Sequence, residues 1–546
     1  MFIKILLTII FVAVMIAVGL YSRKQAASVD GFVLGGRTVG PWLTAFAYGT
    51  SYFSAVVFVG YAGQFGWKYG LSSTWIGVGN AVVGSLLAWL VLGRRTKLMT
   101  QHIESRTMPD FFGTRYQSQG LRVAASIIAF VFLIPYTAGV YKGISTLFEM
   151  GFGVPYEYCV ILMAILTAVY VILGGYKATA MNDFIQGVIM LFGIVTVIAA
   201  VLSAQGGLSA AVEKMTAMPA DNGTTNGGFA TLWGPDPWNL LGVVVLTSLG
   251  TWGLPQMVQK FYAIKSGPAV KQGAIISTVF AFVIAGGSYF LGGFGRLAIE
   301  NPAAAQYIEY NPKTGAIIYD SIMPALVSNI PDILLGVLVV MVLSASMSTL
   351  SSLVLTSSST LTLDLIKGNV VKDMDEKKQV SWMRVLLVVF IALSAGIGII
   401  QVQGSLPFIA QLMGISWGAL AGAFLGPFLW GLYSGKISKA SVWVSFIVGV
   451  GLTTGNMISG LVGTPWIASP INAGALAMIL SIVIVPVVSL FTPAVPFQVN
   501  PPSPKGAGDL AFESATAGQE ISAQTGGKGI EGAAADEIAI PRGGKR

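Results

Sequence analysis

Long hydrophobic runs separated by short polar loops make up most of the chain between residues 2 and 492. A helix needs about 20 mostly apolar residues to cross a bilayer. Runs of this kind lie at about 2–21, 41–64, 73–93, 121–148, 156–174, 181–203, 237–262, 271–295, 327–364, 382–402, 405–433, 440–462 and 470–492. The pattern therefore predicts an all-α polytopic membrane protein with about thirteen transmembrane helices.

The composition supports this fold class and narrows the possible functions. Of the 546 residues, 54% are hydrophobic and 10% are charged, whereas a soluble domain has about 25% charged residues. The single cysteine, Cys159, excludes an intrachain disulfide, and the single histidine, His102, offers no metal cluster. The sequence contains no nucleophile and base pair and no phosphate-binding loop, so we expect neither enzymatic activity nor an organic cofactor.

Lysine and arginine residues are distributed unevenly between alternate loops. The chain carries 31 of them and a net charge of +8, and most fall in every second loop and in the tail after residue 492. Because basic residues concentrate in cytoplasmic loops, this distribution predicts an external N-terminus and a cytoplasmic C-terminus, and it explains the net charge without a nucleic-acid partner. The run at 2–21 is longer than the hydrophobic part of a usual signal peptide and predicts a retained helix.

Two predicted helices are interrupted near mid-membrane by glycine, hydroxyl residues or proline. The interruptions lie at 47–54 (AYGTSYFS) and at 248–255 (SLGTWGLP), five segments apart. This spacing predicts two five-helix units in inverted orientation, each with a broken first helix whose freed carbonyls meet an ion or a solute. The alternative is a pair of ordinary glycine and proline kinks.

The repeat sets the predicted boundaries along the chain. We expect an extra N-terminal helix and cytoplasmic loop at 1–40, repeats at 41–203 and 237–433, an external loop at 204–236, two C-terminal helices at 434–492 and a cytoplasmic tail at 493–546. The tail is rich in proline, glycine and alanine, which predicts disorder.

Hydroxyl residues are unusually dense in the hydrophobic run at 343–362. Ala345, Ser348, Thr349 and Ser352 follow the spacing i, i+3, i+4 and i+7, so they share one helix face. A column of neutral oxygens suits a monovalent cation, although serine and threonine also bond to their own helix carbonyls or fill tight helix contacts. Asp183 is one of few charged residues in the apolar runs, either a helix cap or a contact for a cation.

Two motifs resemble the sodium/solute symporter family over roughly residues 1–492. The first is Gly174 and Gly175 followed by Ala178, Asn182, Asp183, Gln186 and Gly193, and the second is SMSTLSS at 346–352. The resemblance implies a sodium ion held by the carbonyls of Thr50, Phe53 and Ala345 and the hydroxyls of Ser348 and Thr349. For members that use a second sodium, it implies Asp183, Ser351 and Ser352 as further ligands.

The solute is expected between the two helix interruptions. The candidate residues are Tyr52, Ser54, Tyr136, Trp252, Gly253 and Pro255, and aromatic packing is the alternative role for Trp252 and Tyr136. Proline-type members carry a tryptophan where Thr247 stands and an aspartate where Tyr52 stands. The phrases SYFSA, KYGL and GYKA look closer to pantothenate-type and monocarboxylate-type members.

The resemblance implies a sodium-coupled symporter that imports a small organic solute, a carboxylate, amino acid or vitamin-like compound, by alternating access. Its expected partners are that solute, sodium and the lipid bilayer of the cytoplasmic membrane, with no obligatory protein partner. A proton-coupled or uncoupled carrier on the same scaffold is the main alternative. A channel or receptor-like protein gives no reason for the paired interruptions.

Overall fold

Helices account for the regular structure of this protein. The computed structural model describes residues 2–218, 227–311, 315–367, 369–371, 373–403 and 409–497. Within those ranges, β structure is limited to isolated bridges such as the one between Val39 and Ile264. The all-α prediction is therefore confirmed.

Ten helical stretches are long and apolar enough to cross a membrane, or eleven if one bent pair counts as a single span. Two stretches, Val56–His102 and α9 (Tyr156–Ala204), contain 47 and 49 residues, about twice the length that one crossing needs. α9 is interrupted at Gly175, whose φ of 55° and ψ of −151° suit only glycine. The count of thirteen spans stays a prediction, because these long helices cover several predicted segments.

Both predicted interruptions are breaks in the helical backbone. The first separates α3 (Pro41–Tyr52) from the π-helix η3 (Val56–Tyr61) and α4 (Ala62–Tyr69), with Phe53 extended at φ −109° and ψ 99°. The second separates α11 (Pro237–Gly253) from α12 (Pro255–Ala263), with a bend of 47°. The proline after this second break has no N–H with which to continue the preceding helix.

The other long helices complete the bundle. They are α1 (Phe2–Ser22), α5 (Thr74–Gly79) continued by η5 (Asn80–Leu87), η6 (Trp89–Gly93) and α6 (Arg94–His102), α8 (Gln119–Phe152), α13 (Gly267–Ala281) continued by η8 (Phe282–Gly286) and α14 (Gly287–Gly292), α17 (Asp332–Thr360) continued by η11 (Leu361–Ile366), α18 (Glu376–Gln403), α19 (Ile409–Tyr433), α20 (Lys439–Val462) and α21 (Pro470–Ser489).

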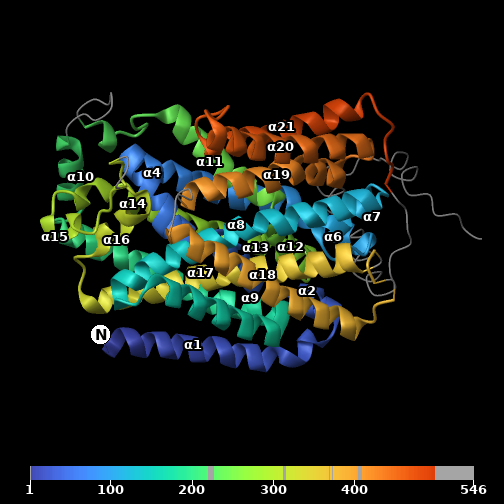
Figure 1. Cartoon of the computed structure of the whole chain (residues 1–546), viewed down its shortest axis with the longest axis horizontal. Helices are drawn as coiled ribbons and strands as arrows, with labels where there is room; N and C mark the ends of the chain where they lie inside the picture. Colours follow the sequence, from blue (N-terminus) through green and yellow to red (C-terminus); the bar gives the residue numbers. More distant parts are fainter. Residues whose placement is uncertain are drawn as a thin grey trace, which may run out of the picture. The chain divides into compact units, whose positions relative to one another are not determined.

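Short helices occupy the connections. They are η1 (Arg23–Ala27), α2 (Val29–Leu34), η2 (Gly35–Arg37), η4 (Gly70–Ser73), α7 (Met108–Arg115), α10 (Leu208–Ala217), η7 (Gly228–Ala230), η9 (Gly295–Ala298), α15 (Pro302–Ala305), η10 (Tyr319–Ser321) and α16 (Ile322–Val327). The predicted external loop at 204–236 therefore contains helical turns. α10, α15 and α16 lie at the end of the bundle where α1 begins, and α2, α6 and α7 lie toward the other end (Figure 1).

α17 occupies the interior of the bundle, beside α9 and α18 in Figure 1. It also contacts α8, α3 and α1, and its side chains from Val342 to Thr360 are all buried. A helix that is covered on every side can place hydroxyls against several partners at once. The hydroxyl-rich helix is therefore central to the site described below.

The predicted tail at 493–546 lies outside the described residues from residue 498 onward. Its first residues attach to the bundle, because the Val495 N–H donates to the Ile437 carbonyl at 2.8 Å. The Arg115 guanidinium also donates to the Val495 carbonyl at 2.9 Å. The described part of the tail is thus fixed next to α7.

Candidate functional site

Four oxygen atoms, one from the first helix break and three from α17, lie together where these two elements meet. The Ser348 hydroxyl donates at 3.0 Å to the carbonyl of Thr50 and at 3.0 Å to the carbonyl of Ala345. The Thr349 hydroxyl lies 3.2 Å from each of the same two carbonyls. All four residues are fully buried and uncharged. We call this group, Thr50, Ala345, Ser348 and Thr349, the neutral oxygen cluster.

The local backbone explains why the Thr50 carbonyl is available. In an uninterrupted helix it would accept the N–H of Ser54, but the extended Phe53 turns the chain away after Tyr52. Ser54 instead starts the next helix, with its hydroxyl accepting the Val56 N–H at 3.2 Å. Hydroxyl oxygens also have lone pairs, so both α17 hydroxyls can rotate to coordinate a cation together with the two carbonyls.

Phe53, the fifth predicted sodium ligand, is placed differently. Its N–H donates to the Gly49 carbonyl at 3.1 Å, which closes the last turn of α3, and its ring stacks on Tyr52 with centroids 4.2 Å apart. In the described part of the chain, no α17 hydroxyl donates to the Phe53 carbonyl. The structure therefore brings four of the five predicted ligands together, with Phe53 at the adjoining break.

One helical turn farther along α17, a charged group replaces the neutral one. The Lys260 ammonium on α12 lies 2.9 Å from the Ser352 hydroxyl and 3.9 Å from the Asp183 carboxylate on α9. The Ser352 hydroxyl is also 2.7 Å from that of Ser51 on α3. We call Ser51, Asp183, Lys260 and Ser352 the charged cluster.

Ser351, the other predicted ligand of a second sodium, points elsewhere. Its hydroxyl donates at 2.9 Å to the carbonyl of Ser348 in its own helix. Sequence reasoning also missed Lys260, which lies within the predicted segment 237–262. An ionisable residue inside a membrane-length segment is the signal that identifies it.

Several predicted solute residues use their polar atoms in helix packing. The Tyr52 hydroxyl donates at 2.6 Å to the Thr247 carbonyl of α11, and the Trp252 indole donates at 3.0 Å to the Val83 carbonyl of η5. Ser54 caps the helix that follows the first break, as described above. These three side chains therefore connect the broken helices to their neighbours.

The remaining predicted solute residues lie near α19. The ring of Tyr136 packs edge-on against Trp417, with centroids 5.7 Å apart. Gly253 presses on the α19 backbone, where a methyl group added to it would come within 2.7 Å of the Ala421 Cα. Pro255 begins α12 directly after this contact.

Four buried polar atoms near the first break lack a hydrogen-bond partner among the described residues. They are the Tyr61 hydroxyl, the Asn80 side-chain nitrogen, the Tyr289 hydroxyl and the Trp417 indole nitrogen. We call them the central polar cluster. They come from four different helices: η3, η5, α14 and α19.

These four side chains are neighbours. The side chains of Tyr289 and Asn80 interact with each other, as do those of Tyr136 and Trp417, and Tyr61 interacts electrostatically with Tyr289. Trp417 contacts both Tyr136 and Tyr52, the latter with ring centroids 6.1 Å apart. Buried polar groups normally have partners, so a set of polar atoms without one in the same place indicates a binding site for a polar ligand.

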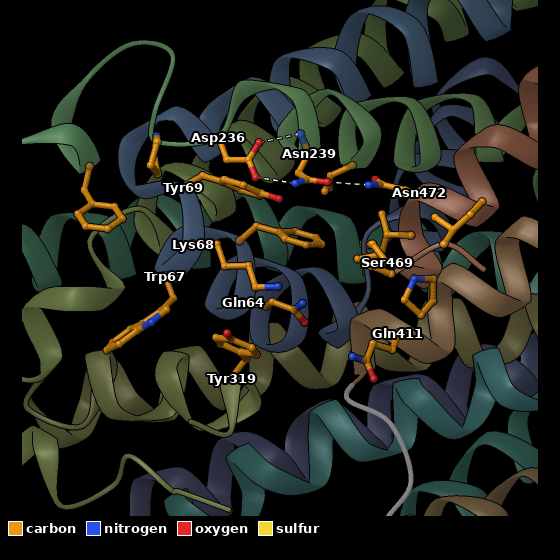
Figure 2. A pocket seen from close by; sticks show the side chains of 18 of the residues that line it. Gln64, Trp67, Lys68, Tyr69, Asp236, Asn239, Tyr319, Gln411, Ser469 and Asn472 are labelled. Atoms are coloured by element: carbon orange, nitrogen blue, oxygen red, sulfur yellow. Dashed lines mark hydrogen bonds between the residues drawn. The ribbon is translucent and has the colours of Figure 1, made fainter. Parts of the chain in front are cut away.

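A cavity of about 820 Å³ is lined by residues at the C-terminal end of α4, among them Gln64, Lys68 and Tyr69. In Figure 2, Lys68 and Gln64 project from α4 between Tyr319 and Gln411. The Lys68 ammonium lies 5.2 Å from the centre of the Tyr319 ring. These α4 side chains are four residues apart and share one helix face, so together they line the cavity.

The opposite wall of the cavity is held by hydrogen bonds (Figure 2). The Asp236 carboxylate caps α11 by accepting the N–H of Asn239 at 3.1 Å and its side-chain amide at 2.5 Å. Asn239 in turn accepts a hydrogen bond of 2.6 Å from Asn472 at the start of α21. The carboxylate is thus engaged within the wall, whereas the lysine across the cavity is directed toward the space.

Sequence comparison assigns the chain to a family. Residues 32–449 match the family model described as Sodium:solute symporter family. The chain belongs to the sodium:solute symporter family. This confirms the resemblance found in the two motifs and identifies the chain as a sodium-coupled membrane transporter.

Two curated relatives cover most of this symporter. It is 28% identical over 464 residues to sodium/proline symporter 2 of Staphylococcus saprophyticus, a match that spans 81% of this chain and 84% of the relative. It is also 28% identical over 471 residues to the sodium/proline symporter of Staphylococcus aureus, covering 84% and 85% of the two chains.

A solved structure supports the fold. The substrate-bound, outward-open state of a Na⁺-coupled sialic acid symporter superposes with a TM-score of 0.69, covering 91% of this chain and all of that one. The two sequences are 17% identical, so this likeness supports the fold and leaves the solute open.

Proposed function

We propose that this protein imports a small carboxylate solute together with sodium across the cytoplasmic membrane by alternating access. The observation that carries the proposal is the neutral oxygen cluster, in which the broken helix α3 and the buried helix α17 present carbonyls and hydroxyls to one point. Sodium bound there connects α3 to α17 and stabilises the state in which the outer side is open. Loss of sodium to the cytoplasm then releases the two helices and the solute.

The net charge that crosses decides whether the membrane potential contributes to transport. Each unit charge gains about 2.3 kcal/mol per 100 mV. One sodium carried with one carboxylate anion moves no net charge, so the sodium concentration gradient drives this pair. With the N-terminus outside and the C-terminus in the cytoplasm, that gradient drives the solute inward.

Three features support a carboxylate solute. Two half-helices begin at the breaks, and helix N-termini attract anions. The central polar cluster supplies four N–H or O–H donors, and no carboxylate accepts from them within the described residues. Among the charged side chains that line the cavity at the end of α4, Lys68 and Arg296 are positive and Asp236 is negative. A solute rich in acceptors satisfies these groups, whereas an amine finds no negative partner in the central polar cluster.

An amino acid of the proline type is the second candidate, favoured by the names of the curated relatives. Purified protein in liposomes distinguishes the candidates. Labelled monocarboxylates, pantothenate, proline and a sugar are offered with an inward sodium gradient, with equal sodium, or with a proton gradient alone. We expect accumulation of a carboxylate with the sodium gradient only. Proline accumulation would replace the carboxylate assignment, and accumulation driven by protons alone would replace sodium coupling.

A further inference from the structure

The charged cluster holds a lysine close to the side chains that a second sodium would need. The Lys260 ammonium contacts the Ser352 hydroxyl at 2.9 Å and faces the Asp183 carboxylate at 3.9 Å. Asp183 and Ser352 are two of the three ligands implied for a second sodium. The third, Ser351, donates to a carbonyl of its own helix. A protein cation therefore already lies between the carboxylate and the hydroxyl.

The burial of this pair makes the lysine a fixed part of the structure. The side chains of Lys260 and Asp183 are 1% and 0% exposed. The Asp183 oxygens have no hydrogen-bond partner within the described ranges, and Lys260 is the cation that faces them. A buried charge without a partner is strongly destabilising, so each of these side chains requires the other. The ring of Tyr176, 5.2 Å from the ammonium, adds a further favourable contact for a cation.

A sodium ion cannot easily join the ammonium at this position. Two like unit charges about 4 Å apart in a buried position repel each other strongly. The single carboxylate of Asp183 can balance only one of them. The neutral oxygen cluster differs, because no lysine or arginine contacts its four residues in the part of the chain that the structure describes.

We infer that the Lys260 ammonium is the resident cation of the charged cluster, so that the protein binds sodium at the neutral oxygen cluster and takes no second sodium at Asp183. The inference rests on the proposed function and specifies its ion stoichiometry. The same contacts also let the lysine link the two broken helices. Through Ser352 and Ser51, Lys260 connects α12, which follows the second break, to α3, which precedes the first.

The test counts bound sodium on the purified full-length protein with sodium-22 alone, without any solute. We expect a single saturable sodium per wild-type chain. Lys260→Gln should add a second bound sodium, because it leaves the Asp183 carboxylate and the Ser352 hydroxyl without a cation. Lys260→Arg should keep the wild-type count. The combined change Lys260→Gln and Asp183→Asn should also return to the wild-type count, since it removes both charges.

Each other outcome overturns a stated part of the account. Two sodium ions on the wild-type protein, or an unchanged count in folded Lys260→Gln, would overturn the role of the ammonium. No saturable sodium on the wild-type protein would instead overturn the proposed function. Size-exclusion profiles identify folded protein. If Lys260→Gln does not fold, a count of two sodium ions on the wild-type protein still overturns the inference.

Discussion

Two oxygen clusters join α3 to α17 at points one turn apart along α17, and they differ in charge. The neutral oxygen cluster joins carbonyls and hydroxyls with no ionised side chain. The charged cluster also contains hydroxyls, those of Ser51 and Ser352, but it includes the ionisable side chains of Lys260 and Asp183 as well. The first can lose its cation without leaving a buried charge, whereas the second cannot. A coupling ion must leave on every cycle, so only the first is suited to a mobile ion.

The largest expected effect comes from unbalancing the charged cluster. Asp183→Asn leaves the buried ammonium of Lys260 without a counter-charge and should destabilise the protein by roughly 3–5 kcal/mol. Thermal unfolding of the purified protein in detergent measures this. The matched control adds Lys260→Gln to the same variant and should recover most of the loss. An Asp183→Asn protein as stable as wild type would show that the pair is not ionised.

Removing a hydroxyl from the charged cluster should have a smaller effect. Ser352→Ala removes a hydrogen bond to the ammonium, and a hydrogen bond to a charged group contributes about 1.5–3 kcal/mol. The loss should appear in unfolding measurements. Ser346→Ala is a suitable control on the same helix, because its hydroxyl donates at 2.8 Å to the Val342 carbonyl four residues earlier. Equal losses in the two variants would contradict a special contact at Ser352.

The central polar cluster should affect the solute and leave sodium unchanged. Tyr289→Phe removes one donor, and a neutral hydrogen bond contributes about 0.5–1.5 kcal/mol, which corresponds to a rise in solute KM of roughly 2- to 12-fold. Sodium-driven uptake in liposomes measures it. Tyr433→Phe is the control, because that hydroxyl donates to the Val91 carbonyl and lies on an exposed side chain. An unaltered solute KM in Tyr289→Phe would remove this residue from the solute site.

The smallest expected effect lies in the cavity at the end of α4. Lys68→Gln should raise the KM for an anionic solute by about twofold at low salt and less at high salt, because exposed charges mainly steer approach and are screened. Uptake rates at two ionic strengths measure it. Lys265→Gln, an exposed lysine beyond α12, should behave like wild type. A lower KM in Lys68→Gln would argue against an anionic solute.

The sequence was sufficient to predict both breaks and most of the neutral oxygen cluster. Glycine and proline mark the breaks locally, and helical spacing places Ala345, Ser348 and Thr349 on one face. Which oxygen atoms of α3 they meet depends on how far the extended residue Phe53 turns the chain. That geometry is set by packing between helices and is not encoded in spacing along one of them.

The residues that sequence reasoning missed depend on tertiary contacts. Tyr61, Asn80, Tyr289 and Trp417 each occur as isolated polar or aromatic residues in apolar segments, where packing is the ordinary role. Only the packing of the four helices brings these polar atoms close to one another without hydrogen-bond partners among the described residues. The role of Lys260 likewise depends on packing, because α12, on which it lies, is entirely buried.

The most direct test of sodium coupling at the neutral oxygen cluster is the sodium concentration that gives half-maximal solute uptake in liposomes. It is compared between wild type, Ser346→Ala and the double variant Ser348→Ala with Thr349→Ala. Losing two hydroxyl contacts with a charged ligand, each contributing about 1.5–3 kcal/mol, should raise this concentration at least about 100-fold in the double variant. Ser346→Ala should match wild type. An unchanged sodium requirement in a folded double variant would contradict the assignment of this cluster as the sodium site.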